Sequence, residues 1–158
     1  MRWTVLDTPI GDLSVGIDDV GICGVQFGPV EGASATPDPE LAPALAELRA
    51  YFAGELIEFT VPLHVRRGSE FERAVWAEMS KIPYGETRTY GEVAAAVGDP
   101  GAARAVGVAC NRNPIPVIVP CHRIVGAGGK LVGFGGGLPR KRHLLELEAG
   151  VAFQRAWA

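Results

Sequence analysis

The sequence changes character at residues 64–68 (His-Val-Arg-Arg-Gly). Before this segment, short β-branched or alternating apolar runs lie between turn-forming residues and predict strands. After it, apolar residues recur at helical spacing behind capping residues. A chain of 158 residues can hold two small packed domains. We therefore predict an α/β domain over residues 1–67 and a mainly helical domain over residues 68–158.

The N-terminal part predicts an antiparallel sheet with one helix. Strands are expected at residues 3–6, 13–17 and 22–27, because turn-rich segments separate these apolar runs. Leucine and phenylalanine side chains near one face predict a helix over residues 40–53, and a further strand is expected over 57–63.

The C-terminal part carries two clear helix starts. Ser69 with Glu72, and Thr89 with Glu92, form capping boxes. Pro100 suits the first position of the next helix, which would run to about residue 110. Two short helices joined by a glycine-containing turn are typical of a helix-turn-helix, although ordinary helical hairpins share this pattern.

The second of these helices is unusually rich in small side chains. Its small residues are Ala102, Ala103, Ala105, Gly107 and Ala109. They indicate either tight helix packing or a backbone that can approach a nucleic-acid groove. Beyond it, residues 115–119 predict a strand, residues 126–137 a glycine-rich loop without phosphate-binding spacing, and residues 139–149 a final helix.

Composition excludes several classes of protein. Hydrophobic residues make up 47% and charged residues 21%, which is typical of a globular chain. No apolar run reaches the ~18 residues of a membrane span, and the first residues lack the pattern of a signal peptide. A cytoplasmic location is expected.

Charge is divided unevenly along the chain. Residues 1–60 contain two basic and ten acidic residues, whereas residues 61–158 contain 13 basic and 8 acidic ones, giving net charges of −8 and +5. The C-terminal part could therefore present a basic surface to nucleic acid.

The three cysteines, Cys23, Cys110 and Cys121, have neither disulfide-framework nor zinc-ligand spacing, so no metal site is expected. Cys121 is followed by His122, a possible base acting through a water. On the final helix Glu148 falls on the apolar face, where a carboxylate must be paired. Together these residues have the thiol, base and orienting carboxylate of a nucleophilic site, in which the sulfur must be ionised.

The segment Pro120-Cys121-His122-Arg123-Ile124, with Asn113-Pro114 and residues 104–107 (Arg-Ala-Val-Gly) before it, resembles the active-site motif of the O6-alkylguanine-DNA alkyltransferases, or methylated-DNA–protein-cysteine methyltransferases. The resemblance runs from about Phe71 to Glu148, half of the chain. The N-terminal region, outside this match, is compatible with the small ribonuclease-H-like α/β domain of that family.

The resemblance implies DNA repair by direct, single-turnover transfer of an alkyl group from O6 of guanine, and by extension O4 of thymine, to the protein's own cysteine. The damaged nucleotide would be flipped out of the duplex at a cost of about a few kcal/mol. The DNA is the alkyl donor, so no cofactor is expected. The expected partner is alkylated double-stranded DNA, bound through its minor groove. The protein is expected to be a monomer, and the resemblance leaves open whether several molecules bind a duplex cooperatively. No membrane or obligate protein partner is expected.

The resemblance also implies roles for individual residues. Cys121 would accept the alkyl group, His122 with Glu148 would remove its proton, Tyr90 would assist the leaving base, and Asn113 would fix the turn before the cysteine. Arg104 would replace the flipped nucleotide, and the DNA surface would also include Ala102, Ala103, Gly107, Tyr90 and Arg123. The base pocket would be lined by Pro116, Val119, Phe134 and Gly135, although Phe134 stands where the family often has tyrosine.

Three alternatives stay open from the sequence. A non-catalytic sensor of alkylated DNA would not need Cys121. A Cys-His-Glu hydrolase of small acyl substrates would turn over repeatedly and leave Arg104 unexplained. A helix-turn-helix regulator would not require the Pro-Cys-His segment.

Overall fold

The computed structural model describes residues 1–34 and 36–157, which divide into two compact units. The first contains residues 1–66 together with 114–118, and the second contains the rest. The division predicted from the sequence, at 67/68, did not anticipate that residues 114–118 group with the first unit.

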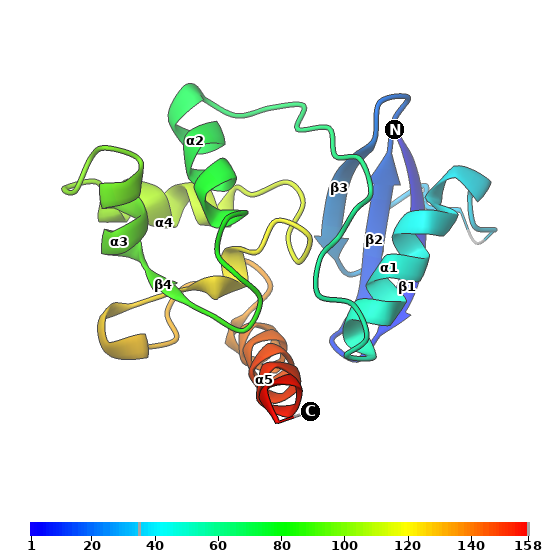
Figure 1. Cartoon of the computed structure of the whole chain (residues 1–158). Helices are drawn as coiled ribbons and strands as arrows, with labels where there is room; N and C mark the ends of the chain where they lie inside the picture. Colours follow the sequence, from blue (N-terminus) through cyan, green and yellow to red (C-terminus); the bar gives the residue numbers. More distant parts are fainter. Residues whose placement is uncertain (35, 158) are drawn as a thin grey trace. The chain divides into compact units, whose positions relative to one another are not determined.

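The first unit is a three-stranded antiparallel sheet with a helix against it (Figure 1). The strands are β1 (Arg2–Thr8), β2 (Gly11–Ile17) and β3 (Ile22–Phe27), and the helices are η1 (Pro39–Leu41) and α1 (Ala42–Phe52). Opposite residues in the register include Leu6 with Leu13, and Val15 with Val25. Side chains of the sheet, of η1 and of α1 supply the buried core, including Leu13, Val15, Leu41, Leu45, Leu48 and Tyr51. The predicted meander and helix are confirmed.

The predicted strand at 57–63 is wrong. Only an isolated parallel bridge, between Leu63 and Ile22, is formed there. Instead, the Glu47 carboxylate accepts hydrogen bonds from the backbone N–H groups of Thr60 and Val61 and from the Thr60 hydroxyl. A side chain of α1 therefore provides the partners that a sheet neighbour would otherwise provide.

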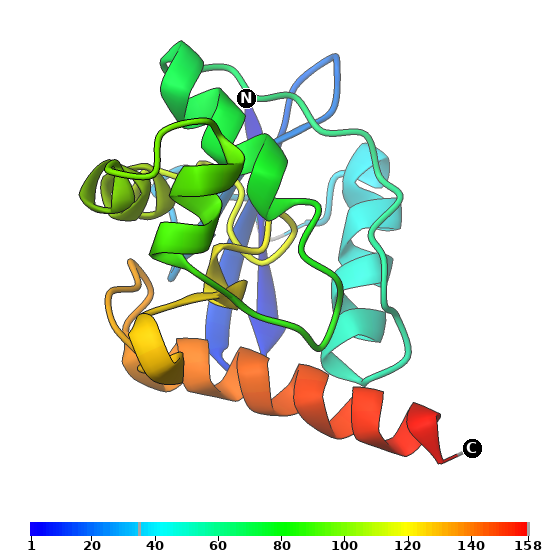
Figure 2. The ribbon, with the colours of Figure 1, turned by 60° about the vertical axis from the view of Figure 1, so that its left-hand side comes forward.

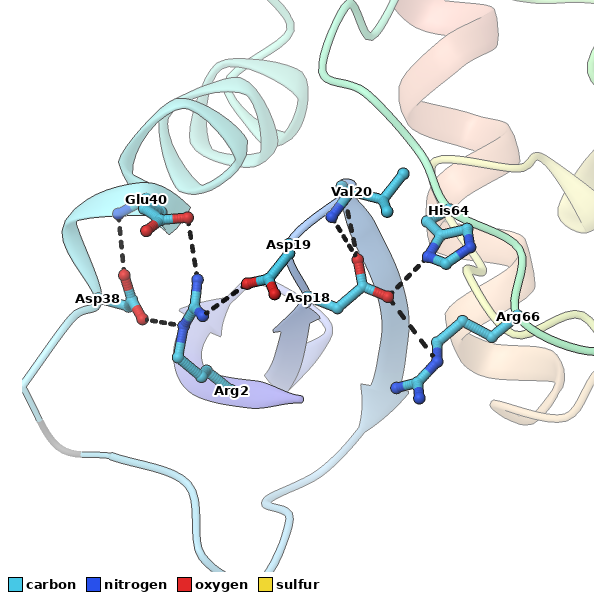
Figure 3. A network of polar contacts seen from close by, with 9 residues as sticks. Arg2, Asp18, Asp19, Val20, Asp38, Glu40, His64 and Arg66 are labelled. Carbon is cyan, nitrogen blue, oxygen red and sulfur yellow. Dashed lines mark hydrogen bonds and ion pairs between the residues drawn. The ribbon is translucent and has the colours of Figure 1, made fainter.

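Asp18, in the turn between β2 and β3, holds the end of the first unit in place (Figure 3). Its carboxylate accepts from the backbone N–H groups of Val20 and Gly21 and lies 2.6 Å from Nδ1 of His64. Partial desolvation raises the pKa of Asp18, but these hydrogen bonds outweigh it and bring the pKa to about 2. Arg66 lies 3.7 Å from the same carboxylate, so the chain is anchored just before the second unit begins.

The second unit contains four α-helices among the described residues (Figure 2). They are α2 (Glu70–Met79), α3 (Tyr90–Ala96), α4 (Ala103–Asn111) and the long α5 (Leu138–Ala156). Strands β4 (Arg88–Thr89) and β5 (Ile124–Val125) form a short parallel pair, with η2 (Cys121–Arg123) before β5 and η3 (Ala127–Gly129) after it.

Helices α2 and α3 begin where the capping residues predict. In both, the Ser69 or Thr89 side chain accepts from the backbone N–H three residues later, and the glutamate there accepts from the cap backbone in return. The packing of α3 against α4, joined by a turn at residues 97–102, confirms the helix-turn-helix. The indole N–H of Trp76 donates to the Ala109 carbonyl at 2.8 Å and ties α2 to α4.

Three other expectations in this region are wrong. Helix α4 begins at Ala103, because Pro100 lies in the turn that the Ala102 N–H closes by donating to the Asp99 carbonyl. Residues 115–119 are not a strand. Val117 is buried, and its backbone has φ 74° in the left-handed region, which interrupts an extended conformation. The last helix continues through Gly150 to Ala156, although a glycine in a helix interior costs up to about 1 kcal/mol. No helix in the described part of the chain is long and apolar enough to cross a membrane.

We predict that Thr89→Ala destabilises the protein by about 1 kcal/mol, because the first turn of α3 loses its side-chain acceptor. The free energy of unfolding, measured by chemical denaturation, checks this. The exposed Thr87→Ala is the matched control and should change stability by less than about 0.5 kcal/mol. Equal losses in the two variants would contradict the capping role.

Candidate active site around Cys121

Cys121 begins the one-turn helix η2, two residues after the segment 115–119 that was predicted to be a strand. Its backbone N–H donates to the Val119 carbonyl at 2.9 Å, and the N–H of Arg123 donates to the Pro120 carbonyl at 3.0 Å. These bonds close a tight turn that places three consecutive functional side chains in the interior. Cys121 is 6% exposed and its thiol is free.

A buried cluster of charged residues lies beside the cysteine. Nε2 of His122 is 2.7 Å from Oε2 of Glu148, and the two side chains are 0% and 1% exposed. Arg123 donates to the same carboxylate through Nε at 2.7 Å and Nη2 at 3.1 Å. Its Nη1 donates to the Ile82 carbonyl at 2.8 Å, and the N–H of Gly85 donates to Glu148 at 3.4 Å. The carboxylate therefore joins α5 to η2 and to the segment between α2 and β4.

This geometry fixes the tautomer of His122. Burial raises the pKa of Glu148, but the bonds from His122 and Arg123 outweigh it and hold the pKa at about 2. An ionised carboxylate only accepts, so Nε2 carries the proton and Nδ1 has the free lone pair. Burial lowers the pKa of His122, and its bond to Glu148 opposes this only in part. Nδ1 is buried with no hydrogen-bond partner in residues 1–34 and 36–157, so it is placed to accept a proton.

The thiol itself is protonated at rest. Burial raises the pKa of Cys121, although a hydrogen bond from Asn113, the charge of Lys141 and nearby backbone N–H groups act in the opposite direction. The sequence led us to expect an ionised sulfur. Instead, the thiol must lose its proton during the reaction. Nδ2 of Asn113 also donates to the Val119 carbonyl at 2.9 Å, which connects the end of α4 to the cysteine turn.

The glycine-rich loop is held from two sides. The Tyr90 hydroxyl donates to the Val132 carbonyl at 3.0 Å, and Nζ of Lys141 donates to the same oxygen at 3.1 Å and to Gly133 at 3.3 Å. Lys141 is 0% exposed and its Nζ lies 5.9 Å from the centroid of the Tyr90 ring. Burial raises the pKa of Tyr90 to about 12, and nearby Cys110 and Cys121 add to the shift. The phenol is therefore a hydrogen-bond donor over the whole physiological range.

Comparisons with known proteins agree over both units. A family model described as the ribonuclease-like domain of 6-O-methylguanine DNA methyltransferase matches residues 1–65, and one described as the DNA binding domain of that protein matches residues 70–150. The chain belongs to the methylated-DNA–protein-cysteine methyltransferase family.

Individual relatives of this methyltransferase family cover nearly the whole chain. The methylated-DNA–protein-cysteine methyltransferase of Mycobacterium bovis is 49% identical, over 94% of this chain and 92% of its own. That of Methanosarcina acetivorans is 46% identical, over 94% and 98%. The structure of Mycobacterium tuberculosis OGT in complex with DNA is 48% identical and matches with a TM-score of 0.87 over 96% of this chain and 94% of that one. The predicted family and two-part fold are confirmed.

The other residues that the family resemblance singles out are not all in one place. Arg104 is exposed on α4, and Ala102, Ala103 and Gly107 are half-buried on or beside the same helix. Gly107 faces the Tyr90 ring, because a Cβ there would lie 3.8 Å from it. Of the predicted pocket residues, Pro116 and Val119 are buried, Phe134 is half-buried and Gly135 is exposed. Pro116 groups with the first unit.

The structure changes the expectation for Arg123 in this methyltransferase-family site and adds Lys141 to the site. Arg123 was predicted to contact DNA, but its side chain is 10% exposed and its guanidinium is bonded to Glu148 and Ile82. Lys141 was missed. It lies three residues before Leu144 and seven before Glu148, on the same buried face of α5, so the reasoning that found Glu148 could have found it.

We predict that Glu148→Gln lowers the free energy of unfolding by about 3 kcal/mol at neutral pH, because Arg123 would be left buried without a counter-ion. A carboxyl with a depressed pKa stabilises the fold above its unfolded pKa, and this contribution is lost as pH falls towards about 2. The difference from wild type should therefore shrink over that range. Denaturation as a function of pH measures it, and the exposed Glu146→Gln on the same helix should show neither effect.

Proposed function

We propose that this protein repairs alkylated duplex DNA by moving the alkyl group irreversibly from O6 of guanine to Sγ of Cys121. The observation that carries the proposal is the buried Glu148–His122 pair beside a free cysteine, with the Nδ1 lone pair of His122 unengaged by the described residues. Membership of the family supports the same chemistry.

The proposed reaction is a displacement at the alkyl carbon. His122 takes the thiol proton at Nδ1 through one water, as the sulfur forms its bond to carbon and the carbon–oxygen bond breaks. The electron pair of that bond stays with guanine, which takes up a proton from solvent, while the imidazolium of His122 releases the thiol proton to solvent. The Tyr90 hydroxyl stabilises the developing charge on guanine by donating a hydrogen bond. Lys141 adds a positive charge that favours the thiolate. The thioether product is not cleaved, so each molecule acts once.

DNA recognition is proposed to centre on α4. DNA binding itself is supported by the matched DNA binding domain and by the M. tuberculosis relative solved with DNA. We infer that α4 enters the minor groove, where its alanines allow a close approach and Arg104 fills the space of the flipped nucleotide. The monomeric state and the cytoplasmic location stay predictions.

We predict that incubation with an oligonucleotide containing one O6-methylguanine adds one methyl group, and no more, to the intact protein. Mass spectrometry of the whole chain measures this. Cys121→Ala should add none and still bind the DNA, whereas Cys23→Ala, which removes another buried thiol, should be methylated like wild type. Repeated turnover, or methylation of Cys121→Ala, would contradict the proposal.

We predict that Arg104→Ala slows methyl transfer from duplex DNA about tenfold. Without the arginine, no side chain occupies the gap that the flipped nucleotide leaves in the DNA base stack. Transfer from a single strand with the same lesion should change little, since no base pair has to open. Single-turnover rates on both substrates test this, with the exposed Arg73→Ala on α2 as control. Equal slowing on both substrates would show that Arg104 does not act in base flipping.

A further inference from the structure

Arg123 donates three hydrogen bonds within the buried cluster and has no part in the reaction described above. Three of its nitrogens are engaged: Nε and Nη2 by the two oxygens of Glu148, and Nη1 by the Ile82 carbonyl. Its guanidinium also lies 5.5 Å from the centroid of the Tyr84 ring. The side chain is thus fixed from α5 and from the segment between α2 and β4.

A histidine–glutamate pair could orient the imidazole without any arginine. Burying a second charge has a desolvation cost, and buried ion pairs often contribute little net stability. The presence of Arg123 therefore calls for a reason other than stability. The reason lies in the charge of Glu148, which is 1% exposed.

A buried carboxylate without a counter-ion favours any change that neutralises it. With Arg123 absent, the nearest such change would be a proton on Nδ1 of His122, which makes an imidazolium 2.7 Å from the carboxylate. An imidazolium has no lone pair and cannot accept the thiol proton. With Arg123 present, Glu148 is already neutralised, and His122 can stay neutral.

Of the other charged groups around His122, Lys141 disfavours the imidazolium as Arg123 does, whereas Glu148 favours it. The imidazole is influenced by Glu148 and Lys141 from α5 and by Arg123 from its own turn, and Cys121 precedes it. The segment between α2 and β4 contributes the Ile82 carbonyl, the Gly85 N–H and the Tyr84 ring. Lys141 also disfavours a second cation nearby, but Arg123 is the cation that binds the carboxylate directly.

We propose that Arg123 is a positioning residue which neutralises Glu148 and thereby keeps His122 in the neutral, Nε2-protonated form that can accept a proton. Its effect on alkyl transfer rests on the proposed function, whereas its effect on the protonation of His122 does not. The two can therefore fail separately.

The first experiment follows the imidazole directly. The chain has three histidines, so the nitrogen chemical shifts of His122 can be assigned with His64→Gln and His143→Gln variants. In Arg123→Met, we expect His122 to be protonated up to a pH at least about one unit higher than in wild type. Arg123→Lys, which keeps the charge, should titrate close to wild type. Arg112→Met, which breaks the exposed ion pair with Glu72, should leave His122 unchanged.

A variant that removes both charges separates electrostatics from packing. In Arg123→Met with Glu148→Gln, no buried carboxylate remains, so His122 should be neutral again at neutral pH. If Arg123→Met alone does not fold, the double variant should fold better than the single one, because the uncompensated charge is gone. An unshifted titration in Arg123→Met, or a double variant no more stable than the single one, would overturn the proposal.

The second experiment measures methyl transfer from the O6-methylguanine oligonucleotide as a function of pH. In Arg123→Met the acid limb of the rate profile should move upward with the His122 titration, whereas a purely structural loss would lower the rate equally at every pH. If wild type transfers no methyl group, the proposed function fails. If wild type transfers it and the acid limb of Arg123→Met stays in place, the role of Arg123 fails.

Discussion

The second unit is organised around one buried carboxylate. Glu148 is almost fully enclosed on α5, and an ionised group there is tolerated only because hydrogen-bond donors meet it on all sides. Those donors come from the turn at Cys121 and from the segment between α2 and β4. The same bonds that allow the charge to be buried bring distant parts of the chain together and set the orientation of the imidazole. Folding and chemistry therefore depend on the same contacts.

Much of the fold follows from local rules in the sequence. The capping boxes at Ser69 and Thr89 mark their helix starts correctly, because a cap is a bond between residues three apart. The antiparallel meander follows from alternating apolar residues separated by turns. Glu148 was found because a charge on an apolar helix face breaks a local pattern. In each case, the information lies within one element.

The errors lie where distant contacts decide the conformation. Residues 57–63 look like a strand, but a side chain of α1 supplies the partners. Residues 115–119 look extended, but Val117 adopts a left-handed conformation that no local pattern of β-branched residues indicates. Arg123 has the sequence character of a DNA-binding arginine, and only the folded chain shows that the partner of its charge is twenty-five residues away.

The carbonyl of Val132 accepts hydrogen bonds from Tyr90 and from Lys141 at once. Each oxygen lone pair can hold one donor, so the phenol can swing away while the ammonium remains. Moving the Tyr90 hydroxyl away then costs only its hydrogen bond to the Val132 carbonyl, about 1 kcal/mol, and the carbonyl oxygen still has Lys141 as a donor. The glycine-rich loop thus keeps its Lys141 anchor when the Tyr90 hydroxyl donates elsewhere, so the hydroxyl can take a new acceptor without release of the loop.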